Sequence, residues 1–210
     1  MNILITGASS LLGKALLNTL RSQVNVTLTW FSNYVGVPMY QMNVCDKLQV
    51  GYIFERCKPD VVIHCAAIGS VDYAEKYPRE TYEINVNGTM NVLEWCKRYN
   101  SRLVYLSTNA VYDGNHPPYN EISERNPINK YGMIKKEAED KIIERYDNWL
   151  IIRPFLMFGY TYPGARKNWV QIVMESLMAG KSMKLVDDVY WQPTLADEVA
   201  RIMWQLVKVS

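Results

Sequence analysis

Short apolar runs alternate along the chain with segments whose apolar residues recur at helical spacing. The first run, residues 2–6, is rich in β-branched residues and leads into the small-residue turn 7–10. Leu12, Leu16 and Leu20 then repeat at helical spacing. A short continuous apolar run predicts a strand that is buried on both faces, as in a parallel sheet. The chain therefore opens with a predicted strand, a tight turn and a helix.

The same alternation continues to the end of the chain. Strands are predicted at residues 24–30, 59–67, 102–107, 149–153 and 182–186, with a short strand or turn within 39–46. Helices are predicted at residues 47–57, 78–99, 128–146, 169–179 and 195–207. Strands that alternate with helices predict an α/β fold with a doubly wound parallel sheet and right-handed crossovers. We expect the first strand at the switch point, beside the strand that ends in Thr108.

The first turn has the spacing Gly7-x-x-Ser10-x-x-Gly13. Gly7 would allow the turn, small side chains would let a pyrophosphate approach the backbone, and the helix N-terminus would offer N–H groups to it. Gly13 would let the helix pack closely on the strand. This pattern predicts the opening of a dinucleotide-binding Rossmann-type unit. An ordinary turn without a ligand is the alternative, because this glycine spacing alone is a weak signal.

The end of the second strand bears on the choice of cofactor. An acidic residue about twenty residues past the glycines holds the adenosine ribose of NAD in such units. Residues 29–33 read Thr-Trp-Phe-Ser-Asn, so no carboxylate is present to repel a 2′-phosphate. Ser32 and Asn33 could donate hydrogen bonds to such a phosphate. NADP is therefore favoured over NAD.

Small and amide residues mark two further strand ends. Asn43 and Val44 stand where an adenine could bind, since an amide both accepts and donates hydrogen bonds. A turn Asn is an equal alternative. Ala66 and Ala67 would leave room for a flat cofactor at the carboxyl edge of the sheet, where ligands bind in open α/β folds. Simple tight packing is the alternative there.

Asn85 lies in the middle of the predicted helix 78–99, where Asn has poor helix propensity. Its side chain could bond back to its own helix or orient a buried water molecule. The sequence leaves both roles open.

Tyr131 and Lys135 lie one turn apart on the predicted helix 128–146. Such a pair shares one helix face, and a nearby ammonium lowers the pKa of a phenol. With 15 Tyr in the chain, about one such match is expected by chance. The position adds weight, because this helix follows the strand that ends in Thr108. Phenol and hydroxyl could therefore converge on one carbonyl group.

Composition excludes several classes of function. The net charge is +2 and no basic block is present, so a nucleic-acid partner is not expected. No apolar run reaches membrane-spanning length, and the N-terminus predicts a strand rather than a signal peptide. The four cysteines lie far apart, which favours free thiols in a reducing cytoplasm. His64 and His116 are too few for a typical zinc site, and no metal is expected.

A set of motifs, in order along the whole chain, resembles the extended short-chain dehydrogenase/reductases. Within them, the chain is most similar to the dTDP-4-dehydrorhamnose reductase family. The motifs are Thr6-Gly-x-x-x-x-x-Gly13, Pro59-Asp-Val-Val-Ile-His-Cys-Ala-Ala67, Val71-Asp-x-Ala-Glu75, Asn85-x-Asn-Gly-Thr89, Ser107-Thr-Asn-Ala-Val-Tyr-Asp-Gly114, Pro118-Tyr-x-Glu121, Tyr131-x-x-x-Lys135, Arg153-Pro154, Asn168-Trp-Val170 and Asp187-Asp-Val-Tyr-Trp-Gln-Pro-Thr194.

The resemblance implies a site and a reaction. Tyr131 would donate a proton to the sugar carbonyl, Lys135 would hold the nicotinamide ribose and lower the pKa of Tyr131, and Thr108 would hydrogen-bond the carbonyl. Hydride would pass from NADPH to C4 of a nucleotide-linked 4-keto-6-deoxy sugar. The implied cofactor-binding residues are Gly7, Ser10, Leu11, Leu12, Gly13, Ser32, Asn43, Val44, Ala66, Ala67, Tyr131, Lys135 and Pro154. The implied substrate-binding residues are Thr108, Asn109, Asn168, Trp169 and Trp191.

The chain departs from the family pattern at three points. Ser10 replaces the middle glycine, and Asn109 replaces the Asp that is common after Ser-Thr. Neither Asn109 nor Ala110 is acidic, which argues against a 4,6-dehydratase. The chain ends at Ser210, whereas the family usually continues through elements that complete a substrate lobe. We expect a Rossmann domain over residues 1–158 and a small, incomplete substrate lobe over 159–210, with helices interleaved with the core fold.

Two other functions remain open beside the reductase. The regulatory β subunit of methionine adenosyltransferase resembles this family and acts through partner binding, so a non-catalytic NADP-binding subunit is one alternative. A sugar-nucleotide epimerase is the other, since Thr108, Tyr131 and Lys135 would serve it too. A nucleotide sugar is the expected small-molecule partner, and a homodimer is one possible assembly.

Overall fold

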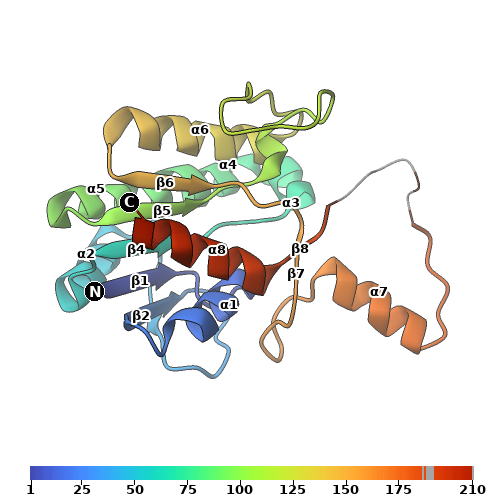
Figure 1. Cartoon of the computed structure of the whole chain (residues 1–210), viewed down its shortest axis with the longest axis horizontal. Helices are drawn as coiled ribbons and strands as arrows, with labels where there is room; N and C mark the ends of the chain where they lie inside the picture. Colours follow the sequence, from blue (N-terminus) through green and yellow to red (C-terminus); the bar gives the residue numbers. More distant parts are fainter. Residues whose placement is uncertain (186, 188–191, 210) are drawn as a thin grey trace.

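The computed structural model describes residues 1–185, 187 and 192–209, and a six-stranded sheet with helices on both faces forms its centre (Figure 1). Its strands are β1 (Asn2–Thr6), β2 (Asn25–Trp30), β3 (Tyr40–Gln41), β4 (Val61–His64), β5 (Arg102–Leu106) and β6 (Trp149–Ile152). All neighbouring strands pair in parallel, in the order β3-β2-β1-β4-β5-β6. The predicted doubly wound parallel sheet is thus confirmed.

One expectation about this sheet is wrong. β1 does not lie beside the strand that leads to Thr108, because β4 pairs with β1 on one side and with β5 on the other. After β3 the chain crosses back and fills the free side of β1 with the fully buried run Val61–His64. The strand order still reverses at β1, where ligands bind in doubly wound sheets.

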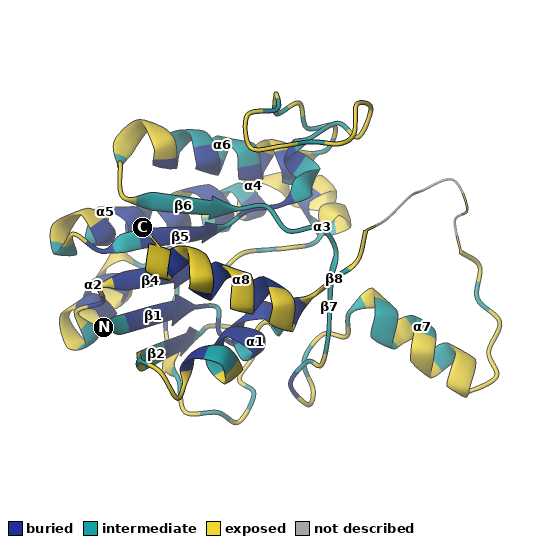
Figure 2. Cartoon of the chain, in the orientation of Figure 1, coloured by how far each residue is buried: buried dark blue, intermediate teal, exposed yellow. Residues whose placement is uncertain are grey.

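The helices form two layers. They are α1 (Leu11–Leu20), α2 (Lys47–Cys57), α3 (Val71–Lys76), α4 (Pro78–Tyr82), α5 (Thr89–Tyr99), α6 (Lys130–Arg145), α7 (Trp169–Met178) and α8 (Ala196–Val209). One apolar cluster joins α1 and α8 to the sheet, and a second joins α2, α5 and α6 to its other face. Along α8, buried residues alternate with exposed ones (Figure 2), as expected of a helix that covers a sheet. The last helix therefore belongs to the core layer.

The predicted helix 78–99 forms, but it contains a wider π-helical stretch, η1 (Glu83–Gly88). Asn85 lies in this stretch and is wholly buried. Its amide accepts from the N–H of Ile68 at 2.8 Å and donates to the carbonyl of Ile68 at 2.9 Å. Asn85 thus binds the loop that follows β4, rather than its own helix.

The part after residue 153 differs most from the prediction. β7 (Met157–Phe158) and β8 (Thr194–Leu195) pair in parallel as a small separate sheet that the sequence did not predict. The short strand predicted at residues 182–186 is wrong for residues 182–185, which find no strand partner in the described part of the chain; residue 186 lies outside it. α7 stands away from the main sheet and has no buried residue (Figure 1).

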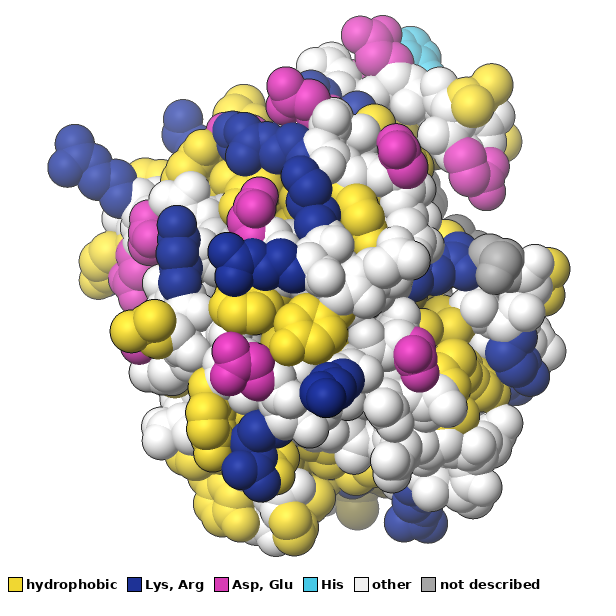
Figure 3. Space-filling view, turned by 90° about the vertical axis from the view of Figure 1, so that its left-hand side faces the viewer, with side chains coloured by type: hydrophobic (Ala, Val, Ile, Leu, Met, Phe, Trp, Pro, Cys, Tyr) yellow, Lys and Arg dark blue, Asp and Glu magenta, His cyan; other side chains and the backbone are white. Residues whose placement is uncertain are grey.

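None of the helices in the described ranges is long and apolar enough to cross a membrane. The C-termini of α2, α5, α6 and α8 lie at the amino edge of the strands, and lysines and arginines stand out on this face (Figure 3). Basic residues in the last turn of α2, α5, α6 and α8 are Arg56, Lys97, Arg98, Arg145 and Lys208. Cations near helix C-termini are stabilised by the helix dipole, which accounts for the position of these charges.

Candidate active site

The turn from β1 to α1 lies directly against the end of β4. Gly7 has φ +65°, and a Cβ at this position would stand 2.7 Å from Cα and from N of Ala66. The N–H of Ala66 donates to the Thr6 hydroxyl at 3.3 Å, which ties the two strand ends together. Ala67 is the next residue and is exposed. Only glycine fits position 7. The turn lies next to Ala66 and Ala67, the small residues that the sequence predicts beside a cofactor.

Ser10 is the N-cap of α1. Its hydroxyl oxygen accepts from the N–H of Gly13 at 3.1 Å, and a Cβ at Gly13 would stand 2.5 Å from the Ala8 carbonyl oxygen. Leu11 and Leu12 are in the first turn, where N–H groups have no acceptor within the helix. Ser10 therefore caps α1, which a glycine at this position could not do because it has no side chain. The N–H groups of Leu11 and Leu12 point beyond the N-terminus of α1.

The residues predicted around an adenine are partly engaged within the protein. The side-chain oxygen of Asn43 accepts from the N–H of Cys45 at 3.0 Å, as in a turn. Val44 is buried, and its carbonyl accepts from the Asn91 amide at 2.9 Å. The NH₂ group of Asn43 makes no hydrogen bond to the described residues and could serve an adenine. Ser32 follows β2 and is exposed.

Thr108 and Tyr131 meet at the carboxyl edge of β5. Burial raises the pKa of the Tyr131 phenol to about 12, although the neighbouring Thr108 hydroxyl acts to lower it. A Cβ at Gly132 would stand 2.1 Å from the Ala110 carbonyl oxygen, so α6 can begin this close to the segment after Thr108 only with glycine there. Asn129 caps the helix by accepting from the N–H of Gly132 at 2.8 Å. A phenol with this pKa is protonated at neutral pH and can donate a proton.

Lys135 is wholly buried one turn further along α6. Its Nζ donates to the Leu106 carbonyl at 2.6 Å and lies 4.1 Å from the centre of the Tyr105 ring. Burial lowers the pKa of Lys135 to about 7, although the nearby charge of Glu139 acts in the opposite direction. An ammonium has three donors, so a ligand can still be held. In this structure, Thr108 is the group that lowers the pKa of Tyr131.

The remaining predicted residues fall into two places. The N–H of Asn109 donates to the Pro154 carbonyl at 3.1 Å, so both lie at the same edge as Thr108. Asn168 caps α7 in a capping box and donates to the Gly159 carbonyl at 2.6 Å, which gives it a structural role. Trp169 begins α7 and is 41% exposed. Trp191 lies outside the described residues.

The sequence reading missed a buried ion cluster. Glu139 is wholly buried and pairs with Arg125 and Arg153. Arg153 belongs to the Arg153-Pro154 motif, but the sequence predicts no specific role for Arg153 itself. Two signals could have found the cluster: Glu139 stands four residues after Lys135, and Arg153 closes a strand.

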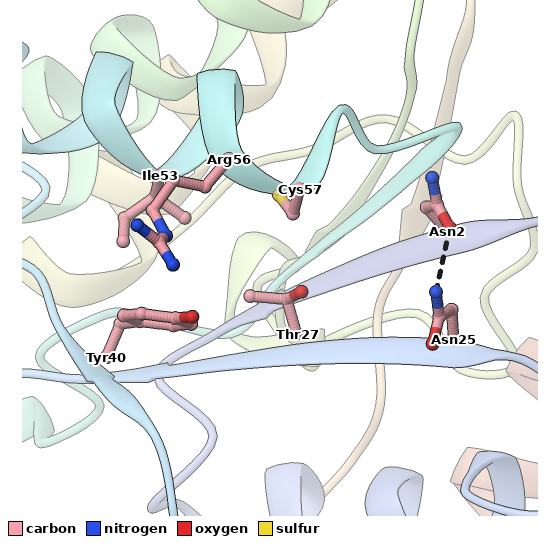
Figure 4. A pocket seen from close by; sticks show the side chains of 7 residues that line it. All are labelled: Asn2, Asn25, Thr27, Tyr40, Ile53, Arg56 and Cys57. Atoms are coloured by element: carbon pink, nitrogen blue, oxygen red, sulfur yellow. Dashed lines mark hydrogen bonds between the residues drawn. The ribbon is translucent and has the colours of Figure 1, made fainter.

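A cavity of about 270 Å³ lies away from these residues (Figure 4). Its lining is Asn2, Asn25, Thr27, Tyr40, Ile53, Arg56 and Cys57. Figure 4 shows the Asn25 amide bonded to Asn2, at 3.3 Å, and the Arg56 guanidinium lies 5.5 Å from the Tyr40 ring centre. Asn2 and Asn25 begin β1 and β2, so this cavity is at the amino end of those strands, opposite Gly7. It contains none of the predicted site residues.

The family model for the RmlD substrate binding domain matches residues 1–210. The chain belongs to this family. The dTDP-4-keto-6-deoxy-D-glucose reductase of Streptomyces niveus is 28% identical over 207 residues, which are 98% of this chain and 68% of that protein. Methionine adenosyltransferase 2 subunit beta of Bos taurus is 28% identical over 214 residues, 98% of this chain and 62% of the subunit. This member of the family thus spans about three fifths of the length of that subunit.

Solved structures of similar proteins share the fold. A hypothetical dTDP-4-dehydrorhamnose reductase from Sulfolobus tokodaii has a TM-score of 0.88 and 30% identity, covering 100% of this chain and 73% of that one. The dTDP-4-dehydrorhamnose reductase of Bacillus anthracis, solved in complex with NADP, has a TM-score of 0.87 and 27% identity, covering 99% and 71%. These findings confirm the resemblance drawn from the motifs.

Proposed function

We propose that this chain carries the catalytic core of an NADP(H)-dependent reductase that acts on the C4 carbonyl of a nucleotide-linked 4-keto-6-deoxy sugar. The observation that carries the proposal is the contact between Thr108 and Tyr131, with buried Lys135 one turn along the same helix. These groups lie at the carboxyl edge of the sheet, where doubly wound folds bind their ligands. Family membership supports the same class of reaction.

The residues at this edge fit a dinucleotide. The first-turn N–H groups of α1 and the dipole of that helix suit a pyrophosphate. The small side chains of Ala66 and Ala67 stand next to this turn and leave room for a flat group. Lys135 has donors to offer a ribose hydroxyl. Residues 29–33 carry no carboxylate and Ser32 is exposed, which supports NADP over NAD; the Bacillus anthracis reductase was solved with NADP.

The proposed chemistry is general acid catalysis with positioned donors. Bound NADPH supplies the hydride that adds to C4 of the sugar. Tyr131 gives its proton to the carbonyl oxygen, so that the oxygen leaves the step as a hydroxyl rather than an alkoxide. The Thr108 hydroxyl hydrogen-bonds the same oxygen as negative charge develops on it. Lys135 holds the ribose and keeps positive charge near the reacting atoms.

We also propose that residues 159–210, with α7, contribute a partial substrate-binding lobe. α7 projects from the sheet, whereas α8 returns to it (Figure 1). Asn168 and Trp169 stand at the start of α7 and would adjoin the sugar nucleotide. Residues 1–158 would then bind the cofactor.

A second candidate is a non-catalytic NADP-binding regulatory subunit. The observation that favours it is the 28% identity to methionine adenosyltransferase 2 subunit beta over nearly the whole chain. Such a role needs cofactor and partner binding, but it does not need Tyr131 to transfer a proton.

The decisive experiment measures oxidation of NADPH by the purified chain in the presence of a TDP-4-keto-6-deoxy sugar. Wild type is compared with Tyr131→Phe and with Tyr52→Phe, a matched loss of one hydroxyl at an exposed tyrosine of α2. The proposal expects turnover in wild type and Tyr52→Phe, and a loss of at least about a hundredfold in Tyr131→Phe. Tight NADPH binding without turnover would instead support the regulatory subunit.

A further inference from the structure

The buried ion cluster of Glu139, Arg125 and Arg153 lies next to Lys135 along α6. Glu139 follows Lys135 by one turn on α6, so the two side chains share a face of the helix. The Glu139 side chain is wholly buried. A buried carboxylate is costly unless it is paired and hydrogen-bonded.

Two arginines pair with this carboxylate. Arg153 donates from Nε to Oε1 at 2.9 Å and from Nη2 to Oε2 at 2.7 Å, which is a two-pronged contact. Arg125 donates from Nη1 to Oε2 at 2.8 Å. The other side of Arg125 pairs with Asp140 at 2.6 Å. The Arg125 and Arg153 side chains are only about one fifth exposed, at 21% and 18%, so water screens these charges weakly.

The cluster joins the segments that carry the proposed catalytic groups. Arg153 also donates to the Tyr112 hydroxyl at 2.8 Å, and Tyr112 lies four residues after Thr108. Arg125 lies six residues before Tyr131. The loop between Thr108 and Tyr131 is therefore held to the middle of α6 near both of its ends.

Several charged or titratable groups surround Lys135. On α6 these are Tyr131 and Glu139, on β5 Tyr105, and at the end of β4 His64 and Cys65. Burial lowers the pKa of His64 to about 3 and raises the pKa of Cys65 to about 12, so both are neutral at pH 7. Burial also raises the pKa of Tyr105. Among these groups, Glu139 carries the negative charge that favours the charged form of Lys135.

We propose that Glu139 is a positioning residue for Lys135: held between Arg125 and Arg153, its carboxylate keeps the Lys135 ammonium charged for the cofactor, and the balance of the three charges sets the pH range in which Lys135 works. The inference rests on the proposed role of Lys135 in holding the NADPH ribose. Glu139, Arg125 and Arg153 would then control the charge of Lys135 in addition to holding the loop between Thr108 and Tyr131.

The test uses two substitutions with opposite electrostatic effects. Glu139→Gln removes the negative charge, so Lys135 should lose its proton at lower pH. Arg125→Gln removes a positive charge and leaves Glu139 less compensated, so Lys135 should keep its proton to higher pH. If the cluster served folding alone, both variants would be less stable than wild type. The pH at which Lys135 loses its proton would not then move in opposite directions in the two variants.

The readout is NADPH affinity between pH 6 and pH 9, measured from the fluorescence of the bound nucleotide with the full chain. Affinity should fall as Lys135 loses its proton. The midpoint of this fall should move down by about one pH unit in Glu139→Gln and up in Arg125→Gln. Arg201→Gln is the matched control, since it removes an exposed arginine that pairs with Glu198 on α8. Lys135→Met should abolish the fall and so identify its origin.

Each outcome decides the inference. Opposite shifts with an unmoved control support it, and equal or absent shifts overturn it. If Glu139→Gln does not fold, Arg125→Gln decides alone: an upward shift supports the inference and an unchanged midpoint overturns it. A wild type that binds NADPH but reduces no sugar rejects the proposed function and leaves this comparison valid, because the comparison is made on binding.

Discussion

Thr6 and His64 are joined across β1 and β4 by a hydrogen bond of 2.7 Å between the Thr6 hydroxyl and Nδ1 of His64. The other ring nitrogen lies 3.0 Å from the Thr89 hydroxyl, which in turn donates to the Asn85 carbonyl at 2.7 Å. Burial, with a smaller contribution from Lys135, lowers the pKa of His64 to about 3. A neutral imidazole therefore links the end of β1, through Thr89, to the π-helical stretch.

Because His64 is neutral in this link, the free energy of unfolding should depend on pH. The unfolded chain binds a proton at His64 near pH 6.5, and the folded chain binds it only near pH 3. The free energy of unfolding should therefore fall as pH drops through this window, by up to about 1.4 kcal/mol per pH unit from this group. Urea unfolding between pH 7 and pH 4 should show a flatter dependence in His64→Gln than in wild type. His116→Gln, at an exposed histidine, should keep the wild-type slope; equal slopes in all three would contradict the prediction.

Lys135 should destabilise the fold at neutral pH. Its pKa is about 7 in the folded chain against an ordinary 10.5, so the unfolded chain holds the extra proton between these values. The free energy of unfolding rises with pH across that window, and the cost of burying the charge is largest below pH 7. Lys135→Met should thus be more stable than wild type by a few kcal/mol at pH 6, with the gap closing towards pH 10.

Thermal unfolding at several pH values measures this effect. Lys47→Met, at an exposed lysine on the first turn of α2, is the control and should change stability little. The prediction fails if Lys135→Met is less stable than wild type at pH 6. The variant should bind NADPH poorly even where it is more stable, as expected of a group retained for function.

Gly7→Ala should damage the turn far more than Gly36→Ala. Both glycines have positive φ, +65° and +75°, so each substitution brings a strain of about 1–2 kcal/mol. A Cβ at residue 7 would also collide with the Ala66 backbone, whereas nothing lies within 4 Å at residue 36. Chemical denaturation should show the larger loss for Gly7→Ala, and NADPH titration should show weaker binding in that variant alone. Equal effects of the two substitutions would refute the collision argument.

Thr108→Val should lower the rate of sugar reduction about tenfold to a hundredfold, while Thr108→Ser should keep most of it. Valine has nearly the shape of threonine but no hydroxyl to hydrogen-bond the carbonyl or the Tyr131 phenol. The lost bond would raise the pKa of Tyr131 further, since Thr108 lowers it now. Steady-state kinetics at neutral pH should therefore show a lower kcat, because Tyr131 becomes a weaker acid. A Thr108→Val enzyme with unchanged kcat would remove Thr108 from the mechanism.

The local pattern of the chain was enough to predict most elements of the Rossmann core. Buried runs such as Val61–His64 and helical repeats such as Leu12, Leu16 and Leu20 specify strand or helix from a few neighbouring residues. The turn at Gly7 and the spacing of Tyr131 and Lys135 are equally local. For the same reason the sequence pointed to the residues of the candidate site, although their roles in binding and catalysis are still predictions.

Only the tertiary structure decided which segments meet. β4 lies between β1 and β5, β7 pairs with β8, and Glu139 pairs with Arg125 and Arg153; each contact joins residues far apart or on different elements. Periodicity reports which face of an element is buried, but not which other element covers that face. The burial of Lys135, and hence its lowered pKa, arises in the same way, because desolvation depends on all the elements packed around the ammonium.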